Sequence, residues 1–245
     1  MVKNCSVRAA AGGNGKERKI GLIDFKELSA YADAFTCSEN ERLKQMEQKA
    51  AASYIPIMQP SSMAFLQQLI RWTGARRILE LGTAIGYSSI RMALAAGSDT
   101  SIITVERDPA MIEEAKQNIE TLNLQHVIHI VYGDATEELQ EVADAAPFDL
   151  ILIDAAKAQY ERMFHRYTQL LREKGIIVTD NVFFHGLVCD IDGVKKRQLN
   201  RLVKKVDAYN HFLAQQSDFD TVFLTVGDGM AVSTMNVHGL HWEER

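Results

Sequence analysis

The stretch ILELGTAIGYSSIRMA, residues 78–93, decides the fold of this chain. Apolar residues surround an acid, Glu80, and Gly82 and Gly86 then bracket a short turn before an apolar pattern of helical period. This order predicts a buried strand, a tight turn and the first turns of a helix. In an open α/β sheet, ligands bind at such turns, beyond the carboxyl ends of the strands.

The length and composition indicate one large domain. The chain has 245 residues, 47% hydrophobic and 24% charged, and no run of about 18 apolar residues that would span a membrane. Residues 1–19 are rich in Gly, Ala and Lys and have no apolar core, so we expect a disordered extension rather than a secretory signal. The domain is expected over 20–236, with a C-terminal tail at 237–245.

Charge and cysteine content narrow the class of protein further. The cysteines, Cys5, Cys37 and Cys189, are scattered and form no C-x-x-C pair. That usage favours a reducing, cytoplasmic location and argues against a disulfide frame or a zinc site. A net charge of −5 provides no global attraction to nucleic acid.

Strand and helix patterns alternate through the middle of the chain. A pair of helical patterns spans 24–53, where Ser38 and Glu41 are spaced as a capping box, and another spans 60–75. Apolar strands are predicted at 77–82, 101–106, 127–132, 149–154 and 175–181, and helices at 87–96, 108–123, 136–144, 158–172 and 194–216. Such alternation predicts a parallel sheet covered on both faces. Two last strands, 219–226 and 229–234, meet at Gly227-Asp228-Gly229, which is a hairpin signal. The expected fold is therefore Rossmann-like α/β, with a seven-stranded, mostly parallel sheet and a C-terminal antiparallel hairpin.

The turn after the first strand lacks the features that bind phosphates. A dinucleotide turn needs G-x-G-x-x-G, but Thr83, Ala84 and Ile85 follow Gly82, so the middle glycine is missing. A P-loop needs a lysine, and this turn has none. The missing middle glycine also argues against an NAD-dependent oxidoreductase.

The acids that follow the turn fit a ligand without phosphate. Glu106 ends the next strand, 20 residues after Gly86, where it can accept hydrogen bonds from both ribose hydroxyls. Ser88, near a helix N-terminus, can donate to a carboxylate, and Asp134 can accept from an adenine amino group. Adenine, ribose and a carboxylate together indicate S-adenosylmethionine. The alternative is that Glu80 and Glu106 merely end their strands in water.

Polar oxygens also gather at the ends of the fourth and fifth strands. Asp154 ends one strand, and Asp180 and Asn181 end the next. Two carboxylates and an amide oxygen suit Mg²⁺, or Ca²⁺ or Mn²⁺, rather than zinc. Lys157 lies three residues past Asp154, where a bound dication would lower its pKa and make it a general base for a hydroxyl proton. The alternative assigns these acids to turns and caps and Lys157 to the surface.

These motifs together resemble a known family. ELGTAIGYSSIRMA, LIDAAKAQY and TDNV are similar to the magnesium- and S-adenosylmethionine-dependent O-methyltransferases of the catechol and caffeoyl-CoA type, which have a class I methyltransferase fold. The resemblance covers about residues 24–236 and implies a homodimer. It implies metal ligands at Asp154, Asp180 and Asn181 and a catalytic lysine at Lys157, with Asp154 also in the catalytic set. The expected cofactor-binding residues, including those of the turn itself, are Met58, Glu80, Gly82, Ser88, Glu106, Asp134, Ala135 and Asp154.

The acceptor is the open question, because both a catechol and 5-hydroxyuridine present two adjacent oxygens to a metal. YIPIMQ, IDAAKAQY, TDNVFFHGLV and VGDGMAVS particularly resemble bacterial tRNA 5-hydroxyuridine methyltransferases, which implies formation of 5-methoxyuridine at the wobble position of tRNA. The stretch 194–206 has six basic residues and no acid. Its candidate tRNA-binding residues are Lys196, Arg197, Arg201, Lys204 and Lys205. The alternatives are a small catechol-like or hydroxycinnamoyl acceptor, with 194–206 a solvated amphipathic helix, or an RNA-binding protein without catalysis.

Overall fold

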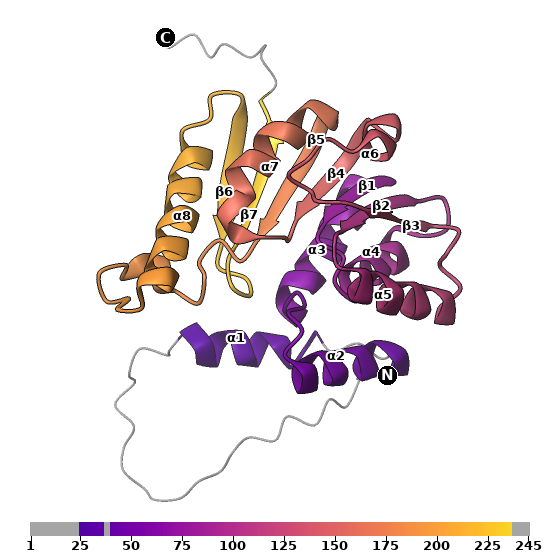
Figure 1. Ribbon diagram of the computed structural model, residues 1–245, viewed down its shortest axis with the longest axis horizontal. Coiled ribbons are helices and arrows are strands. Elements are labelled where there is room, and N and C mark those ends of the chain that lie inside the picture. The colour runs from indigo at the N-terminus through magenta and orange to yellow at the C-terminus, as the bar shows by residue number, and fades with distance from the viewer. Residues whose placement is uncertain (1–24, 37–39, 237–245) are drawn as a thin grey trace, which may run out of the picture.

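A computed structural model describes residues 25–36 and 40–236 of the chain (Figure 1). The predicted extension at 1–19, the tail at 237–245 and Ser38 lie outside the described residues. The described part contains one seven-stranded sheet with the order β3-β2-β1-β4-β5-β7-β6. Its strands are β1 (Arg77–Leu81), β2 (Ser101–Glu106), β3 (Ile128–Tyr132), β4 (Phe148–Ile153), β5 (Leu171–Asp180), β6 (Phe219–Leu224) and β7 (Met230–Met235).

The direction of the strands confirms the predicted topology. β1 to β5 pair in parallel, whereas β7 runs antiparallel between β5 and β6. The chain order reverses at β1, which pairs with β2 on one side and with β4 on the other. That reversal opens a crevice at the carboxyl ends of the two strands, which is where ligands bind in doubly wound sheets.

Side chains alternate across the sheet and build a core on each face. Ile78 and Leu150 point into one core, and Leu79 and Ile151 point into the other. The first core is closed by α2 (Glu41–Ser53), α3 (Pro60–Thr73), α4 (Tyr87–Ala96) and part of α5 (Pro109–Thr121). The second is closed by α6 (Gln140–Asp144), α7 (Tyr160–Tyr167) and α8 (Arg197–Ala214). Figure 1 shows these two helical layers, with α1 (Phe25–Asp33) beside α2 below the sheet.

Several boundaries differ from the prediction, each for a local reason. α7 ends at Tyr167, a 3₁₀ turn covers Thr168–Leu170, and β5 begins at Leu171 rather than at 175. The first residues of β5, 172–174, are exposed, so they carry no apolar strand pattern. The helix expected from 136 begins only at Gln140, because Asp134 accepts the Thr136 backbone N–H and holds a turn there.

The start of α2 is also capped differently from the prediction. Asn40 is the N-cap, and its side chain accepts hydrogen bonds from the backbone N–H groups of Arg42 and Leu43. An amide oxygen at this position satisfies helix N–H groups that would otherwise have no partner. In the part of the chain that the structure describes, no helix combines the length and the apolar composition needed to cross a membrane.

Candidate active site

A cleft of about 880 Å³ lies at the carboxyl ends of the central strands. Nine of the predicted site residues line it: Met58, Gly82, Ser88, Glu106, Asp134, Ala135, Asp154, Lys157 and Asn181. Two more, Glu80 and Asp180, are fully buried behind this lining. The basic residues predicted at α8 lie outside the cleft. The fold therefore assembles the predicted cofactor and catalytic residues in one place.

The first glycine of the turn is required by a close approach of two strands. Gly82 has φ +107°, and a Cβ on this residue would overlap the carbonyl oxygen of Asp154. Gly82 N–H donates to the Val105 carbonyl at 3.0 Å, which fixes the turn between β2 and β4. Gly86, with φ +81°, then starts α4, so the N-terminus of that helix faces the turn.

Glu106 is held in place by backbone donors from two sides. Its Oε2 accepts the Ala84 N–H at 2.9 Å, and its Oε1 accepts the N–H groups of Arg107 and Asp108 at 2.9 and 3.0 Å. A carboxylate has about four lone-pair sites, and these three N–H groups occupy three of them. One site therefore remains for a ligand hydroxyl. Glu106 is therefore a fixed acceptor at the expected ribose position.

Asp134 is an ionised acceptor at the expected adenine position. Its Oδ1 accepts from the backbone N–H and the hydroxyl of Thr136, at 2.8 and 2.7 Å, and its Oδ2 accepts from Arg107 at 3.0 Å. These hydrogen bonds, with those of Thr136 the strongest, lower the pKa of Asp134. The carboxylate is thus charged at neutral pH and suited to an amino-group donor.

Glu80 does not reach the cleft but lies beneath the turn. Its buried carboxylate accepts hydrogen bonds from the hydroxyls of Ser88, Ser89 and Thr104. Burial raises the pKa of Glu80 from 4.5 to about 7, against the opposing effect of these hydroxyls. The sequence predicted that Ser88 donates to a ligand carboxylate. A hydroxyl has only one proton, and Ser88 donates it to Glu80 instead. Its oxygen can instead accept from a ligand ammonium, and the N–H groups of the helix start can bind the carboxylate.

The ends of β4 and β5 form a polar cluster beside the turn. Lys157 Nζ donates to Asn181 Oδ1 at 2.7 Å, and Asn181 Nδ2 donates to Asp180 Oδ2 at 3.3 Å. Burial, followed by the charge of Asp154, raises the pKa of Asp180 to about 8. Burial also raises the pKa of Asp154, which Lys157 opposes. The cluster therefore holds one buried carboxylate, Asp180, and one at the cleft wall, Asp154, with Lys157 as the neighbouring positive charge.

This cluster fits a hard divalent cation. The Oδ1 atom of Asp180 is buried and has no hydrogen-bond partner among the described residues. Within those residues, no three His, Cys, Asp or Glu side chains converge as metal ligands, so a cation would depend on Asp154, Asp180 and the Asn181 amide oxygen. An incomplete set of oxygen donors suits Mg²⁺, which keeps several waters in its coordination shell.

Sequence reasoning missed a network that ties α2 to the cofactor turn. Tyr87 lines the cleft, and its hydroxyl donates to Glu47 at 2.6 Å and accepts from Arg91 at 2.6 Å. Arg91 also donates to Gln67 of α3 at 2.8 Å. The partners lie 40 and 24 residues apart in the chain, so no local pattern could reveal them.

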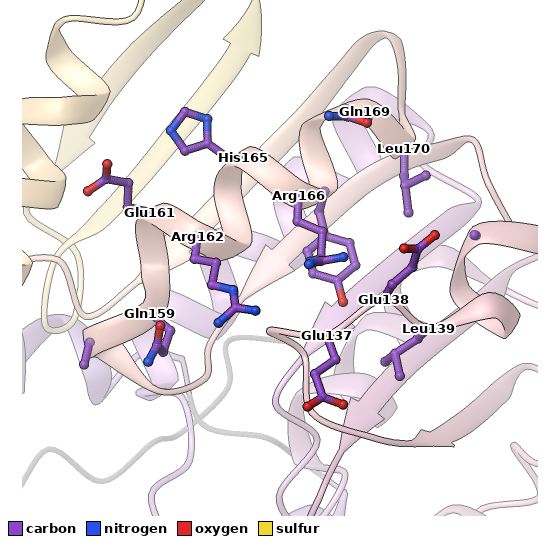
Figure 2. Close-up of a pocket in the computed structure, with 13 residues that line it drawn as sticks. Glu137, Glu138, Leu139, Gln159, Glu161, Arg162, His165, Arg166, Gln169 and Leu170 are labelled. Carbon is purple, nitrogen blue, oxygen red and sulfur yellow. The ribbon is translucent and has the colours of Figure 1, made fainter.

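A second cleft, of about 780 Å³, lies on the other side of the segment that carries Lys157. Figure 2 shows Arg162 and Arg166 of α7 on one wall, facing the segment with Glu137 and Glu138. The Tyr167 hydroxyl and Arg166 Nε have no partner in the described part of the chain, but both atoms are buried beneath the surface of this cleft. None of the predicted site residues lines this second cleft.

Comparison with known proteins shows which family the chain resembles over most of its length. A family model described as O-methyltransferase matches residues 27–235. The chain is 32% identical over 218 residues to a catechol O-methyltransferase of Niastella koreensis, covering 85% of this chain and 96% of that protein. A crystal structure from Staphylococcus aureus matches with a TM-score of 0.78 at 38% identity, covering 86% and 99% of the two chains. An O-methyltransferase from Bacillus cereus, solved in complex with SAH, matches with a TM-score of 0.73 at 29% identity, covering 85% and 97%.

Proposed function

We propose a specific reaction for this chain, which belongs to the O-methyltransferase family. The chain is an S-adenosylmethionine-dependent enzyme of the catechol and caffeoyl-CoA type, and the proposal concerns its acceptor and its use of a metal. The acceptor presents two adjacent oxygens, one of which is methylated, and a divalent cation at this site would supply Lewis-acid chemistry to them. The observation that carries this proposal is the contact of Lys157 with Asn181, beside Asp154, in the same cleft as the glycine turn.

The predicted site residues have distinct roles in the proposed reaction. Glu106 accepts from a ribose hydroxyl of S-adenosylmethionine, which supplies the methyl group, and Asp134 accepts from the adenine amino group. Asp154, Asp180 and Asn181 would hold Mg²⁺, which acidifies a coordinated hydroxyl. Lys157 takes the proton of the acceptor hydroxyl, and its contact with Asn181 keeps the amine next to the metal position.

A small catechol-like acceptor has the support of the relatives. The relative from Niastella koreensis is a catechol O-methyltransferase, and the match covers 96% of that protein. The direct test is methyl transfer to a panel of catechol, caffeate and the corresponding monophenols, with products identified by mass spectrometry. We expect vicinal diols to react and monophenols to fail, because only the former can chelate. Equal rates for both classes would contradict the proposed chelation.

Methylation of 5-hydroxyuridine in tRNA is the second candidate, and one surface favours it. All six basic residues of the segment 194–206, which runs into α8, are exposed, and none forms an ion pair among the described residues: Lys195, Lys196, Arg197, Arg201, Lys204 and Lys205. The connection between β5 and α8, which carries Asn181 at its start and contains a 3₁₀ turn at Leu187–Cys189, ends in this basic segment. Phosphate neutralisation dominates the affinity for nucleic acid. A direct competition between catechol and undermethylated tRNA, with 5-methoxyuridine quantified by nucleoside mass spectrometry, separates the two acceptors.

We also propose a homodimer, supported by exposed apolar side chains on the first and third helices. Leu28, Tyr31 and Phe35 are 55–62% exposed on and just after α1, and Trp72 of α3 is 71% exposed. A self-association surface would cover such residues. Light scattering should give twice the mass of 27.5 kDa, and Trp72→Glu should shift the protein toward the monomer if α3 is part of the interface.

A further inference from the structure

The turn between the last two strands does more than join them. Gly227 and Gly229 both have positive φ, and a Cβ would overlap the Ser62 hydroxyl at Gly227 and the Phe183 ring at Gly229. Asp228 between them is only 6% exposed, although it lies in a turn. A turn residue is usually solvated, so its burial against neighbouring segments needs a separate reason.

Asp228 is bonded to the loop that follows β5. Its carboxylate Oδ1 accepts the His185 N–H, and its backbone carbonyl accepts the Phe183 N–H at 3.0 Å. The adjacent Gly229 carbonyl accepts the Val182 N–H at 3.1 Å. Three hydrogen bonds thus connect the turn, which supplies the acceptors, to the loop, which supplies the N–H donors.

The loop would not keep its shape without such bonds. Asn181, Phe184 and His185 all have left-handed backbone, with φ of 57°, 46° and 57°, although none of them is glycine. Non-glycine residues in this region are strained and persist only where surrounding contacts hold them. The Asp228 carboxylate bonds directly to one of these three residues.

The same loop sets the geometry of the polar cluster. Asn181 accepts from Lys157 at 2.7 Å, and the Phe184 ring lies 5.7 Å from the Lys157 ammonium. A change in the loop backbone would therefore move both the amide oxygen and the aromatic surface that contact this lysine.

We infer that Asp228 is a positioning residue, which acts on Lys157 and Asn181 through the 181–186 loop. Asp228 does not touch the reacting atoms in this role, and its side chain acts as a hydrogen-bond acceptor. The activity readout rests on the proposed function, whereas the exchange readout described next does not.

The test compares Asp228→Ala, which removes the acceptor, with Asp228→Asn, which keeps an acceptor oxygen. Asp220→Asn is the matched control, because Asp220 is an exposed acid of the same hairpin. Backbone amide exchange across 182–186 is measured by NMR, and kcat and KM are measured with the best acceptor found. We expect Asp228→Ala to speed exchange in this segment at least tenfold and to lower kcat at least tenfold, with the KM for S-adenosylmethionine unchanged. Asp228→Asn should stay within threefold of wild type on both readouts.

Two outcomes would overturn the inference: unchanged exchange in Asp228→Ala, or equal damage in Asp228→Ala and Asp228→Asn. If Asp228→Ala does not fold, the wild-type protein decides the matter. Its His185 amide should then exchange at least a hundredfold slower than an unprotected amide, and free exchange would refute the role. A wild-type protein that methylates no acceptor contradicts the proposed function only, since the exchange measurements need no substrate.

Discussion

Glu80→Gln should change how the stability of the protein depends on pH. The carboxyl is fully buried, and its pKa in the folded state is about 7 rather than 4.5. The folded protein therefore binds a proton at this site more tightly than the unfolded chain does. Stability contributed by that proton is complete below pH 4.5 and is lost as the pH rises through 7, because ionising Glu80 in the folded state is disfavoured.

The pKa difference sets the magnitude of the effect. At about 1.4 kcal/mol per pH unit, the interval from 4.5 to about 7 corresponds to roughly 3 kcal/mol. Glutamine resembles the neutral carboxyl in shape but does not titrate. Relative to the variant, the wild type should thus lose about 3 kcal/mol of unfolding free energy between pH 4.5 and 7.5.

Urea denaturation of both apo proteins, followed by circular dichroism at half-unit pH steps, measures this difference. Asp154 and Asp180 are present in both proteins, so the difference between the two curves reports Glu80 together with its electrostatic interaction with Asp154. Glu120→Gln is the control, since Glu120 is exposed on α5 and the substitution makes the same change of side chain at the surface. A flat difference curve for Glu80→Gln would refute the assignment of a raised pKa.

The remaining predictions concern the cofactor, the metal and the basic surface. Glu106→Ala should weaken S-adenosylmethionine binding by roughly 1.5–3 kcal/mol in calorimetry, the scale of a charge-assisted hydrogen bond, and unchanged affinity would contradict the ribose assignment. EDTA and Asp180→Asn should each abolish turnover, with Mg²⁺ restoring only the chelator-treated enzyme; full activity in metal-free buffer would contradict a role for the metal. Reversing the charges of Arg197, Arg201 and Lys204 should raise the KM for tRNA and flatten its salt dependence by about 2–3 units of slope, without changing cofactor affinity. Equal salt dependence in the wild type and the triple variant would contradict the role of this surface in tRNA binding and favour the small-molecule acceptor.

The predictable parts of the fold are those that depend on local sequence patterns. The apolar strand at Ile78, the turn at Gly82 and the acid at Glu106 each have a spacing that follows from strand and turn geometry. Parallel strands bring their carboxyl ends to one edge of the sheet, so Asp154 and Asn181 were expected to meet. The structure places both of them in the same cleft.

The parts that were not predictable depend on partners distant in the chain. Glu80 looked like a cofactor contact, but hydroxyls from α4 and β2 enclose it beneath the turn. In the sequence, Asp228 is only the middle residue of a hairpin turn. Its hydrogen bond to His185 could not be predicted, because the two positions lie 43 residues apart. Residues 172–174 have the composition of a surface segment, and they lie in an irregularity of the β4–β5 pairing, between Leu171, which pairs with Phe148, and Ile176, which pairs with Leu150.

The place of β7 in the sheet has a consequence for the order in which the enzyme matures on the ribosome. The cofactor-binding residues and Lys157 have all been synthesised by the time β5 emerges, yet β5 then has an open edge. That edge is covered only when β7, near the end of the described chain, inserts between β5 and β6. A nascent chain stalled before Phe219 would thus carry every cofactor and metal residue while exposing an unpaired strand that invites aggregation. Synthesis of the last hairpin therefore completes the protection of the sheet as well as the acceptor side of the cleft.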